Sequence, residues 1–256
     1  MASFQLSKWY LDCVTDVGDA VIVYTGVVQW KKFRLHYSSL LQTGNGGVVE
    51  RRSLRRQASP ETAGSKISWH SKPLKFDGAW EALSSAVTET IYRSPEGAID
   101  WNCLMPLARA RVGDRPGLGY AEHLTMTIPP WKLPIHTLRW GRFTSATDWL
   151  TWIDWQGEYS RRIVFLNGEA LDCPIIEDDR IEAGDEMRLS MDRSLVLRDG
   201  RLGETALSGV PAIRKIFPSR LVEMVECKWR SRSRLERKGR PAAEGWAIHE
   251  KVSWPQ

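Results

Sequence analysis

The sequence predicts an all-β protein made of antiparallel strands. Three observations predict this class. Segments rich in β-branched and aromatic residues recur along the 256 residues of the chain, which is typical of strands. Turn residues separate these segments at intervals of about 8–12 residues, the spacing found in β-sandwiches and up-and-down barrels. Short helices are expected in only two places, residues 41–56 and residues 211–217.

The strands of the first half are bounded by recognisable turns. Residues 9–15 and 20–28 are expected to be strands on either side of Asp16-Val17-Gly18-Asp19. Further strands are expected at residues 67–70, 78–83, 88–92 and 98–105, and loops at residues 43–47 and 60–65. Glycine, proline and aspartate mark the breaks between them, because these residues favour turns.

The second half shows clearer hairpins. Residues 162–166 and 169–172 flank Asn167-Gly168, the pair preferred in a type I′ turn. Residues 187–191 and 194–198 are expected to form a second hairpin at Asp192-Arg193. Two long strands, residues 221–229 and 245–254, are expected to be separated by a basic loop.

A domain boundary is expected in residues 112–118, VGDRPGL, where glycine, proline and charge concentrate. It divides the chain into residues 1–116 and residues 117–256. Each part has a size typical of a small antiparallel barrel. No strong internal sequence repeat is evident.

The net charge of +5 comes largely from two basic groups, Arg51, Arg52, Arg55 and Arg56, and the run of residues 228–240. Neither belongs to a known nucleic-acid-binding motif, so both are expected to be solvated loops or strand edges. No nucleic-acid partner is expected. An interaction module that uses these patches on an anionic partner remains a further alternative.

Several other classes are disfavoured by missing patterns. The four cysteines form no CxxC pair, so no metal site is expected. No phosphate-binding loop or GxGxxG motif is present, and no cofactor is expected. Residues 1–7 lack the features of a secretory leader, and no apolar run is long enough to span a membrane. We therefore expect a cytoplasmic protein without an integral membrane segment.

The most informative stretch is residues 119–157, which contain five of the thirteen tryptophans interleaved with charged side chains. Strand alternation places Glu122 with Tyr120 on one face and His123 on the other. The same rule places Asp154 beside Trp152. An aromatic wall with a few polar groups aimed through it predicts a pocket for an apolar small molecule.

Carboxylates on apolar faces are costly unless they are paired or protonated. Burial raises the pKa of a carboxyl group, so an acid such as Glu122, Asp154 or Glu250 could act as a proton donor near neutral pH. The alternative is a buried ion pair with an arginine, for example Arg139 or Arg162. His123 could carry a proton or could be a structural histidine.

Three blocks of sequence resemble a known family. They are WYLDCVTDVGDAVIVYTG at residues 9–26, GYAEHLTMTIPPWKLPIHTLRWGRF at residues 119–143 with WIDWQG and VFLNGE after it, and GWAIHEKVSW at residues 245–254. Together they resemble the hydroxyneurosporene synthase (carotenoid 1,2-hydratase) and AttH-like group, and more distantly tocopherol cyclase. The resemblance implies two lipocalin-like β-barrels in tandem. It also implies hydration or cyclisation of apolar prenyl or polyene substrates without a cofactor.

The resemblance carries over to particular residues of the opening and central blocks, namely Trp9, Tyr10, Asp12, Tyr120, Glu122, His123, Trp131, Trp140 and Arg142. Where the hydratases have aspartate followed by histidine, this chain has Glu122-His123, so the acid is kept on a longer side chain.

The sequence therefore predicts a cofactor-independent hydratase, cyclase or isomerase that acts by proton transfer on a prenyl, polyene or polyketide-like molecule. The candidate catalytic residues are Glu122, Asp154, Tyr120 and His123. The candidate substrate-binding residues are Trp131, Trp140, Arg142, Trp152, Asp12 and Glu250. The alternative is a non-catalytic lipocalin-like carrier of a lipophilic ligand, which would tolerate the loss of the acids.

Overall fold

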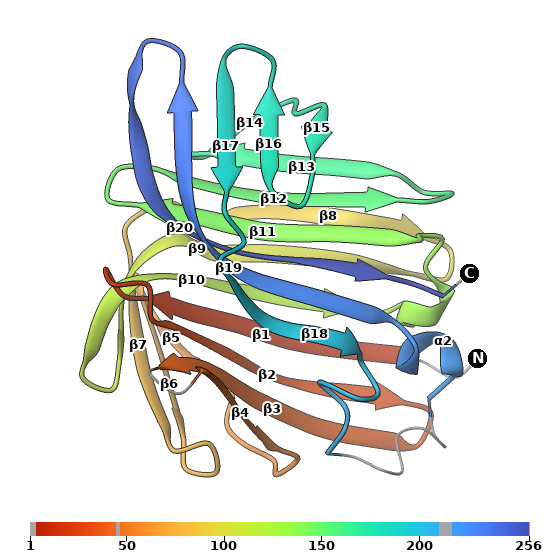
Figure 1. The fold of residues 1–256 in the computed structure, drawn as a ribbon. Coiled ribbons are helices and arrows are strands. Elements are labelled where there is room, and N and C mark those ends of the chain that lie inside the picture. Colours follow the sequence, from red (N-terminus) through yellow and green to blue (C-terminus); the bar gives the residue numbers. More distant parts are fainter. Residues whose placement is uncertain (1–3, 45–46, 210–216, 256) are drawn as a thin grey trace. The chain divides into compact units, whose positions relative to one another are not determined.

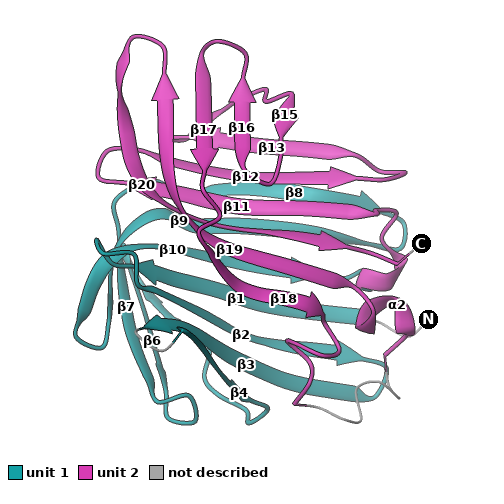
Figure 2. Ribbon diagram, viewed as in Figure 1, with its two compact units in different colours: residues 1–129 teal, residues 130–256 magenta. Residues whose placement is uncertain are grey.

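The structure of the protein is a computed structural model, which describes residues 4–44, 47–209 and 217–255. The chain divides into two compact units, residues 1–129 (unit 1) and residues 130–256 (unit 2), shown in Figure 2. Each unit is a ten-stranded antiparallel sheet around an apolar core of its own. The predicted all-β class is confirmed. No helix in the described part of the chain has the length and apolarity needed to cross a membrane.

Unit 1 contains strands β1 (Phe4–Val14), β2 (Ala20–Trp30), β3 (Phe33–Gly44), β4 (Gly47–Ser53), β5 (Glu61–Ala63), β6 (Lys66–Ser71), β7 (Phe76–Ala82), β8 (Val87–Ser94), β9 (Gly97–Val112) and β10 (Arg115–Met126). Their order in the sheet is β4-β3-β2-β1-β10-β9-β7-β6-β5, and β8 also pairs with β9. Figure 1 shows β1, β2, β3 and β4 side by side in that order. The strand pairing thus runs from β4 at one edge of the sheet to β5 at the other.

Unit 2 contains strands β11 (Thr137–Ser145), β12 (Trp149–Gln156), β13 (Arg161–Leu166), β14 (Glu169–Ala170), β15 (Ile175–Ile176), β16 (Arg180–Ala183), β17 (Met187–Met191), β18 (Leu195–Arg201), β19 (Val225–Arg237) and β20 (Arg240–Ser253). Two short helices, η1 (Pro130–Lys132) and α2 (Ser219–Val222), complete it. The sheet order is β14-β13-β12-β11-β20-β19-β17-β16-β15, with β18 also pairing with β19. Unit 2 therefore repeats the topology of unit 1 strand for strand.

The boundary between the units lies between Pro129 and Pro130, later than the expected boundary of residues 116 and 117. Residues 112–118 include the turn of the hairpin β9–β10, both strands of which belong to unit 1. Gly113 in this turn has a φ of 61°, a conformation that favours glycine. The concentration of glycine, proline and charge there reflects a hairpin turn and not a linker.

The predicted turn at Asn167-Gly168 is confirmed. It joins β13 to β14, and the two residues have φ values of 52° and 95°, as a type I′ turn requires. The second predicted hairpin, at Asp192-Arg193, is wrong, because β17 and β18 each pair with the long strand β19 and not with each other. A strand of this length accommodates two partners in succession.

The basic run of residues 228–240 lies mostly within β19, an inner strand of the unit 2 sheet, and not in a loop as expected. Its first four basic residues, Lys228, Arg230, Arg232 and Arg234, fall on alternate positions and so share one face of the strand. The opposite positions hold Trp229, Ser231, Ser233 and Leu235, all buried. A charge-rich composition is thus compatible with a central strand when the charges alternate.

Of the two expected helices, the first is wrong, because residues 41–44 are the end of β3 and residues 47–53 are strand β4. Residues 43–47 and 60–65, expected to be loops, contain parts of strands β3, β4 and β5. The other expected helix, residues 211–217, lies outside the described residues except for Phe217.

The apolar core of unit 1 defines two faces of its sheet. The core face carries Leu11, Val23 and Ala121, which belong to the buried apolar cluster. The opposite face carries Tyr10 and Tyr120, which are also buried. Both faces of β1 and β10 are therefore removed from solvent at their centres.

Gly141 of β11 allows the core of unit 2 to close. A Cβ atom at this position would overlap the ring of Trp152 and lie 2.7 Å from Cβ of His249, so we expect Gly141→Ala to cost about 1–3 kcal/mol of stability through overpacking. Gly44→Ala is the matched control, since nothing lies within 4 Å of a Cβ there. Denaturant unfolding of both variants measures the difference, and equal stability of the two would contradict this packing.

Candidate functional site

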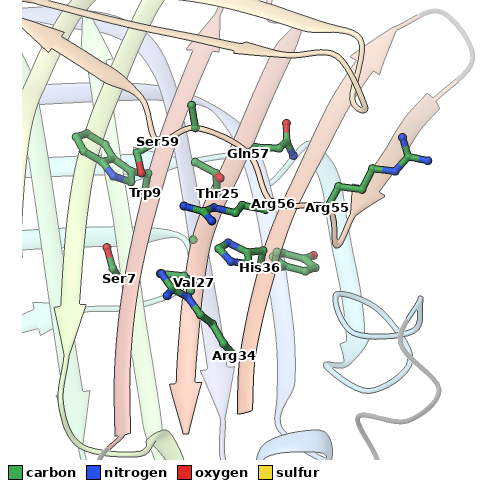
Figure 3. Close-up of a pocket in the computed structure, with 13 residues that line it drawn as sticks. Ser7, Trp9, Thr25, Val27, Arg34, His36, Arg55, Arg56, Gln57 and Ser59 are labelled. Atoms are coloured by element: carbon green, nitrogen blue, oxygen red, sulfur yellow. The ribbon is translucent and has the colours of Figure 1, made fainter. Parts of the chain in front are cut away.

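Unit 1 contains a cavity of about 500 Å³ on the core face of its sheet (Figure 3). Its wall includes Ser7 and Trp9 of β1, Thr25 and Val27 of β2 and His36 of β3. The remaining wall comes from Arg34 and from the segment of residues 54–60 that joins β4 to β5, which we call the strap. A volume of this size suits a small organic molecule.

Strand register explains why these side chains meet. Ser7 pairs with Val27, and Val27 pairs with His36, so the three residues form one row across the core face. The next row contains Trp9 and Thr25. Trp9 packs against the apolar core. From there the two rows extend the core face toward the N-terminal end of β1. The cavity is thus the extension of the core at which polar residues replace apolar ones.

The strap is held in place by hydrogen bonds to the barrel. The Gln57 side chain donates to Ser38 Oγ and accepts from Ser71 Oγ. The indole N–H of Trp69 donates to the Ala58 carbonyl over 2.9 Å. Ser38 and Ser71 are buried, so the strap is tied to the interior of the unit and not to a mobile surface group.

His123 of β10 lies beside the cavity. Its Nε2 is 2.8 Å from Oγ of Ser7, and its ring centroid is 4.7 Å from that of Trp9. Burial lowers the pKa of His123 below its usual value of 6.5, so the ring is predominantly neutral at pH 7. His123 is therefore a neutral base that is hydrogen-bonded to Ser7, whose side chain lines the cavity.

Two other predicted residues, Glu122 and Tyr120, share a face as expected, but it is the face opposite the core cluster and His123. Glu122 Oε2 accepts hydrogen bonds from the Tyr120 hydroxyl at 2.7 Å and from Nε1 of Trp101 at 2.5 Å. Burial, with the neighbouring Cys103 and Glu122, raises the pKa of Tyr120 well above its usual value. Tyr120 consequently keeps its proton and acts as a hydrogen-bond donor to Glu122.

Asp12 belongs to the same buried group. It is 1% exposed, and its Oδ2 accepts a 2.8 Å hydrogen bond from the hydroxyl of Tyr10. The Tyr10 ring meets the Tyr120 ring edge-on, at 5.8 Å between centroids. Burial also raises the pKa of the Cys103 thiol, which stays protonated. These residues form a hydrogen-bonded network on the face of the sheet away from the cavity.

Asp154 lies in unit 2, on the same face as Trp152, as predicted. It is 1% exposed and forms ion pairs with Arg162 at 3.2 Å and Arg139 at 3.8 Å. Nε2 of Gln156 donates to its other oxygen at 2.7 Å. Of the two alternatives considered for Asp154, these contacts correspond to the buried ion pair.

Arg139 extends the ion-pair group to Asp178, over 2.7 Å. Burial alone would raise the pKa of Asp178, but the hydrogen bond and charge of Arg139, with Lys251, lower it. Asp154 and Asp178 are therefore both paired with Arg139.

Glu250 forms an ion pair with Lys228, which is fully buried. Lys228 also lies 3.5 Å from Glu226, which pairs with Arg198 at 3.2 Å. The ammonium group of Lys228 is 5.7 Å from the ring centroid of Trp140. Glu250 and Trp140, predicted to bind substrate, thus both contact a buried lysine.

The other predicted substrate-binding residues of unit 2 contact the core or neighbouring groups of the chain. Trp152 is part of the apolar core, and the Trp131 ring packs against Phe217 at 5.9 Å. Arg142 is fully buried, and its Nη1 donates to Thr144 Oγ1 and to the Trp246 carbonyl, each at 3.0 Å.

The predicted site residues therefore fall into separate groups. Glu122, Tyr120, His123 and Asp12 belong to unit 1, whereas Asp154, Trp131, Trp140, Arg142, Trp152 and Glu250 belong to unit 2. Of these residues, His123 forms a hydrogen bond with Ser7, which lines the cavity of unit 1 from the core face.

A histidine also pairs with a serine in unit 2. His249 Nε2 lies 2.8 Å from Ser231 Oγ, and its ring stacks on Trp229 with centroids 5.1 Å apart. The segments GYAEH of β10 and GWAIH of β20 place His123 and His249 at equivalent strand positions. This short internal repeat is a sequence signal that could have identified the two histidines, whereas their serine partners lie on strands that are not equivalent, β1 and β19.

The residues that sequence reasoning missed are Ser7, Arg34, His36 and the strap. Arg34 and His36 are two residues apart, a spacing that places both on one face of a strand. In the described part of the chain, no group of three or more histidine, cysteine, aspartate and glutamate residues is arranged to hold a metal ion.

Searches by sequence gave no match, either to a protein-family model or to a curated protein. Comparison of folds found solved structures that match nearly the whole chain. Kievitone hydratase from Nectria haematococca has 12% identity and a TM-score of 0.57, over 96% of this chain and 88% of that one. A putative AttH protein from Nitrosomonas europaea has 10% identity and a TM-score of 0.59, over 98% and 92% of the two chains.

CghA, also solved with Sch210972, has 8% identity and a TM-score of 0.55, over 98% of this chain and 88% of that one. These matches show that the chain has the same fold as the AttH protein and the hydratase. The predicted tandem lipocalin-like architecture is confirmed, and the predicted resemblance to AttH-like proteins holds at the level of the fold.

Proposed function

We propose that this protein is a cofactor-independent enzyme of the hydratase, cyclase or isomerase type, and that it transfers protons on a small organic molecule bound in the cavity of unit 1. The observation that carries the proposal is the 2.8 Å hydrogen bond between Ser7 and His123 at the wall of this cavity. It supplies a base in contact with a hydroxyl at the place where a ligand fits.

The pair has the properties that proton transfer requires. A neutral imidazole accepts a proton near pH 7, and burial favours the neutral form of His123 by lowering its pKa. The Ser7 hydroxyl extends the reach of the ring into the cavity and relays a proton from a substrate O–H or C–H, or from an attacking water. The contact with Trp9 keeps the ring in place, because a packed ring is held in one orientation.

The comparisons support the same class. One protein of this fold is named a hydratase, and another was solved with a small organic molecule. The cavity differs from the apolar pocket predicted from sequence, because polar and basic side chains make up most of its lining. The substrate therefore combines an unsaturated or aromatic body, facing Trp9 and Val27, with polar groups.

This proposal assigns proton transfer to His123 and not to the acids predicted from sequence. Glu122 accepts two hydrogen bonds on the face away from His123, and Asp154 is ion-paired to two arginines. We propose that Glu122 and Tyr120 position β10, the strand that carries His123, through their buried network.

The test begins with native mass spectrometry of the purified protein, to identify a co-purified molecule. That molecule and a panel of unsaturated ketones and polyene acids are then incubated with the protein in ²H₂O. Gain of water, ring closure or deuterium incorporation is followed by liquid chromatography and mass spectrometry. We expect turnover by the wild type, and a fall of about 10²–10⁴-fold in His123→Gln and Ser7→Ala, with ligand binding retained.

Glu122→Gln is the comparison variant, expected to keep turnover within about tenfold of the wild type because it retains hydrogen-bond acceptance. If Glu122→Gln abolishes turnover while His123→Gln does not, the acid predicted from sequence is the proton donor and our assignment is wrong. Binding of a co-purified molecule without turnover of any compound would overturn the enzymatic proposal in favour of a carrier.

A further inference from the structure

We propose that the cavity of unit 1 contains a carboxylate-binding site formed by Arg34 and His36 of β3 and Arg56 of the strap. The bound molecule is then an organic acid whose unsaturated or aromatic body lies against Trp9 and Val27. This inference rests on the proposed function in that it names the substrate class for the same cavity.

The geometry of β3 and the strap brings the three side chains to one place. Arg34 and His36 alternate with Leu35 along β3 and so share the core face, where His36 is the register partner of Val27. In Figure 3 the guanidinium groups of Arg34 and Arg56 lie over the strands on the same side as the His36 ring. Arg55 extends in the other direction, away from the labelled side chains.

The positive charge in this cavity is not neutralised by the protein. No acidic side chain lines the cavity, and within the described residues no carboxylate forms an ion pair with Arg34 or Arg56. Of the acids on either side of the strap, Glu50 is already paired with Arg52, and Glu61 is exposed at the start of β5. Two cations that face one cavity repel each other, so a bound anion would be favoured there.

The pKa of His36 responds to this positive charge. Its partial burial and the charges of Arg34 and Arg56 lower its pKa. A neutral imidazole keeps one N–H as a hydrogen-bond donor, and it adds no third charge to the two guanidinium groups. An anion bound between the arginines would reverse their effect and raise the pKa of His36.

The donor set fits a carboxylate. The planar fork of a guanidinium group matches the two oxygens of a carboxylate, and two such forks with an imidazole N–H offer more donors than one carboxylate needs. Arg56 is held near the site because the next residue, Gln57, is bonded to Ser38 and Ser71. Trp9 and Val27 supply an apolar wall for the rest of the molecule.

Binding of trans-cinnamate to the purified protein tests the proposal by isothermal titration calorimetry, with cinnamamide and inorganic phosphate as separate probes. We expect Arg34→Gln and Arg56→Gln each to weaken cinnamate binding about tenfold, the usual effect of losing a charged hydrogen bond. Arg111→Gln is the matched control and should bind within about twofold of the wild type, since Arg111 is an exposed residue of β9 that does not line the cavity. Cinnamamide should bind at least about tenfold more weakly than cinnamate.

An NMR titration of the histidine ring protons gives a second measurement, in which saturating cinnamate should raise the titration midpoint of His36 in the wild type and much less in Arg56→Gln. Equal binding of cinnamate and cinnamamide, or equal weakening by Arg111→Gln and Arg56→Gln, would overturn the carboxylate site. Phosphate binding as tight as cinnamate binding would overturn the assignment to an organic acid.

The outcome separates this inference from the proposed function. Charge-specific cinnamate binding without turnover of any compound supports the carboxylate site and overturns the enzymatic proposal. Turnover that depends on His123 but is unchanged in Arg34→Gln and Arg56→Gln supports the enzymatic proposal and overturns the carboxylate site.

Discussion

Replacing Lys228 by methionine is expected to destabilise the protein by about 3–5 kcal/mol, the usual cost of removing one partner from a buried ion pair. Lys228 is fully buried and contacts the carboxylates of Glu226 and Glu250. Methionine fills a similar volume, so the loss comes from the two carboxylates that keep their charge without their cation. Arg198 still pairs with Glu226, and Glu250 is therefore the more affected acid.

Guanidinium chloride unfolding followed by tryptophan fluorescence measures this free energy. Lys238→Met is the matched control, because Lys238 also forms an ion pair, with Glu186 at 2.8 Å, but both side chains are exposed; its unfolding midpoint should equal that of the wild type. The double variant Lys228→Met/Glu250→Gln should recover part of the loss, since it removes a stranded charge. A Lys228→Met midpoint as high as that of Lys238→Met would show that the buried charges are not coupled.

The acids of the predicted site show what strand alternation can and cannot reveal. Alternation correctly places Glu122 with Tyr120 and Asp154 with Trp152. It does not reveal ion-pair partners on other strands, because the pairing register of two strands cannot be read from the sequence of one of them. Lys228 and Glu250 are opposite each other across β19 and β20, yet the basic run that contains Lys228 was expected to be a loop.

Alternation also leaves open which face of a strand meets the core. It placed Glu122 and Tyr120 on one face of β10 and His123 on the other, without showing which face meets the core. The apolar cluster lies on the face of Ala121, and His123 points toward the cavity residues. Both faces of β10 are buried at its centre, so side-chain size does not distinguish them.

The cavity was missed because it depends on tertiary structure. No element was predicted for residues 29–40, and a helix was predicted for residues 41–56, so His36 was not placed beside Trp9. Three strands and the strap contribute to the wall. The all-β class, in contrast, follows from local features such as the turn at Asn167-Gly168, and these are visible in sequence.

His249 of β20 gives the fold of unit 2 a dependence on pH. The ring is 3% exposed and accepts or donates one hydrogen bond with Ser231. Burial lowers its pKa from 6.5 to about 3, while Asp178 and Asp192 favour the protonated ring and Arg193 and Lys228 oppose it. The folded protein therefore keeps His249 neutral over a range in which the unfolded chain binds a proton.

Since the pKa of His249 is lower in the folded state, the unfolded state binds more protons between pH 6.5 and pH 3, and stability falls as the pH is lowered through this range. From pH 7 to pH 5 the loss of stability due to this one group is about 2 kcal/mol, at about 1.4 kcal/mol per pH unit below 6.5.

We expect His249→Gln to lack this part of the loss, because glutamine does not titrate. Urea unfolding of both proteins at pH 7, 6 and 5 measures the difference in unfolding free energy. The contributions of the carboxylates, which both proteins share, cancel in this difference. His70→Gln, a substitution of an exposed histidine, is the control for the replacement of histidine by glutamine. Stability profiles of the wild type and His249→Gln that remain parallel down to pH 5 would contradict a neutral, buried His249.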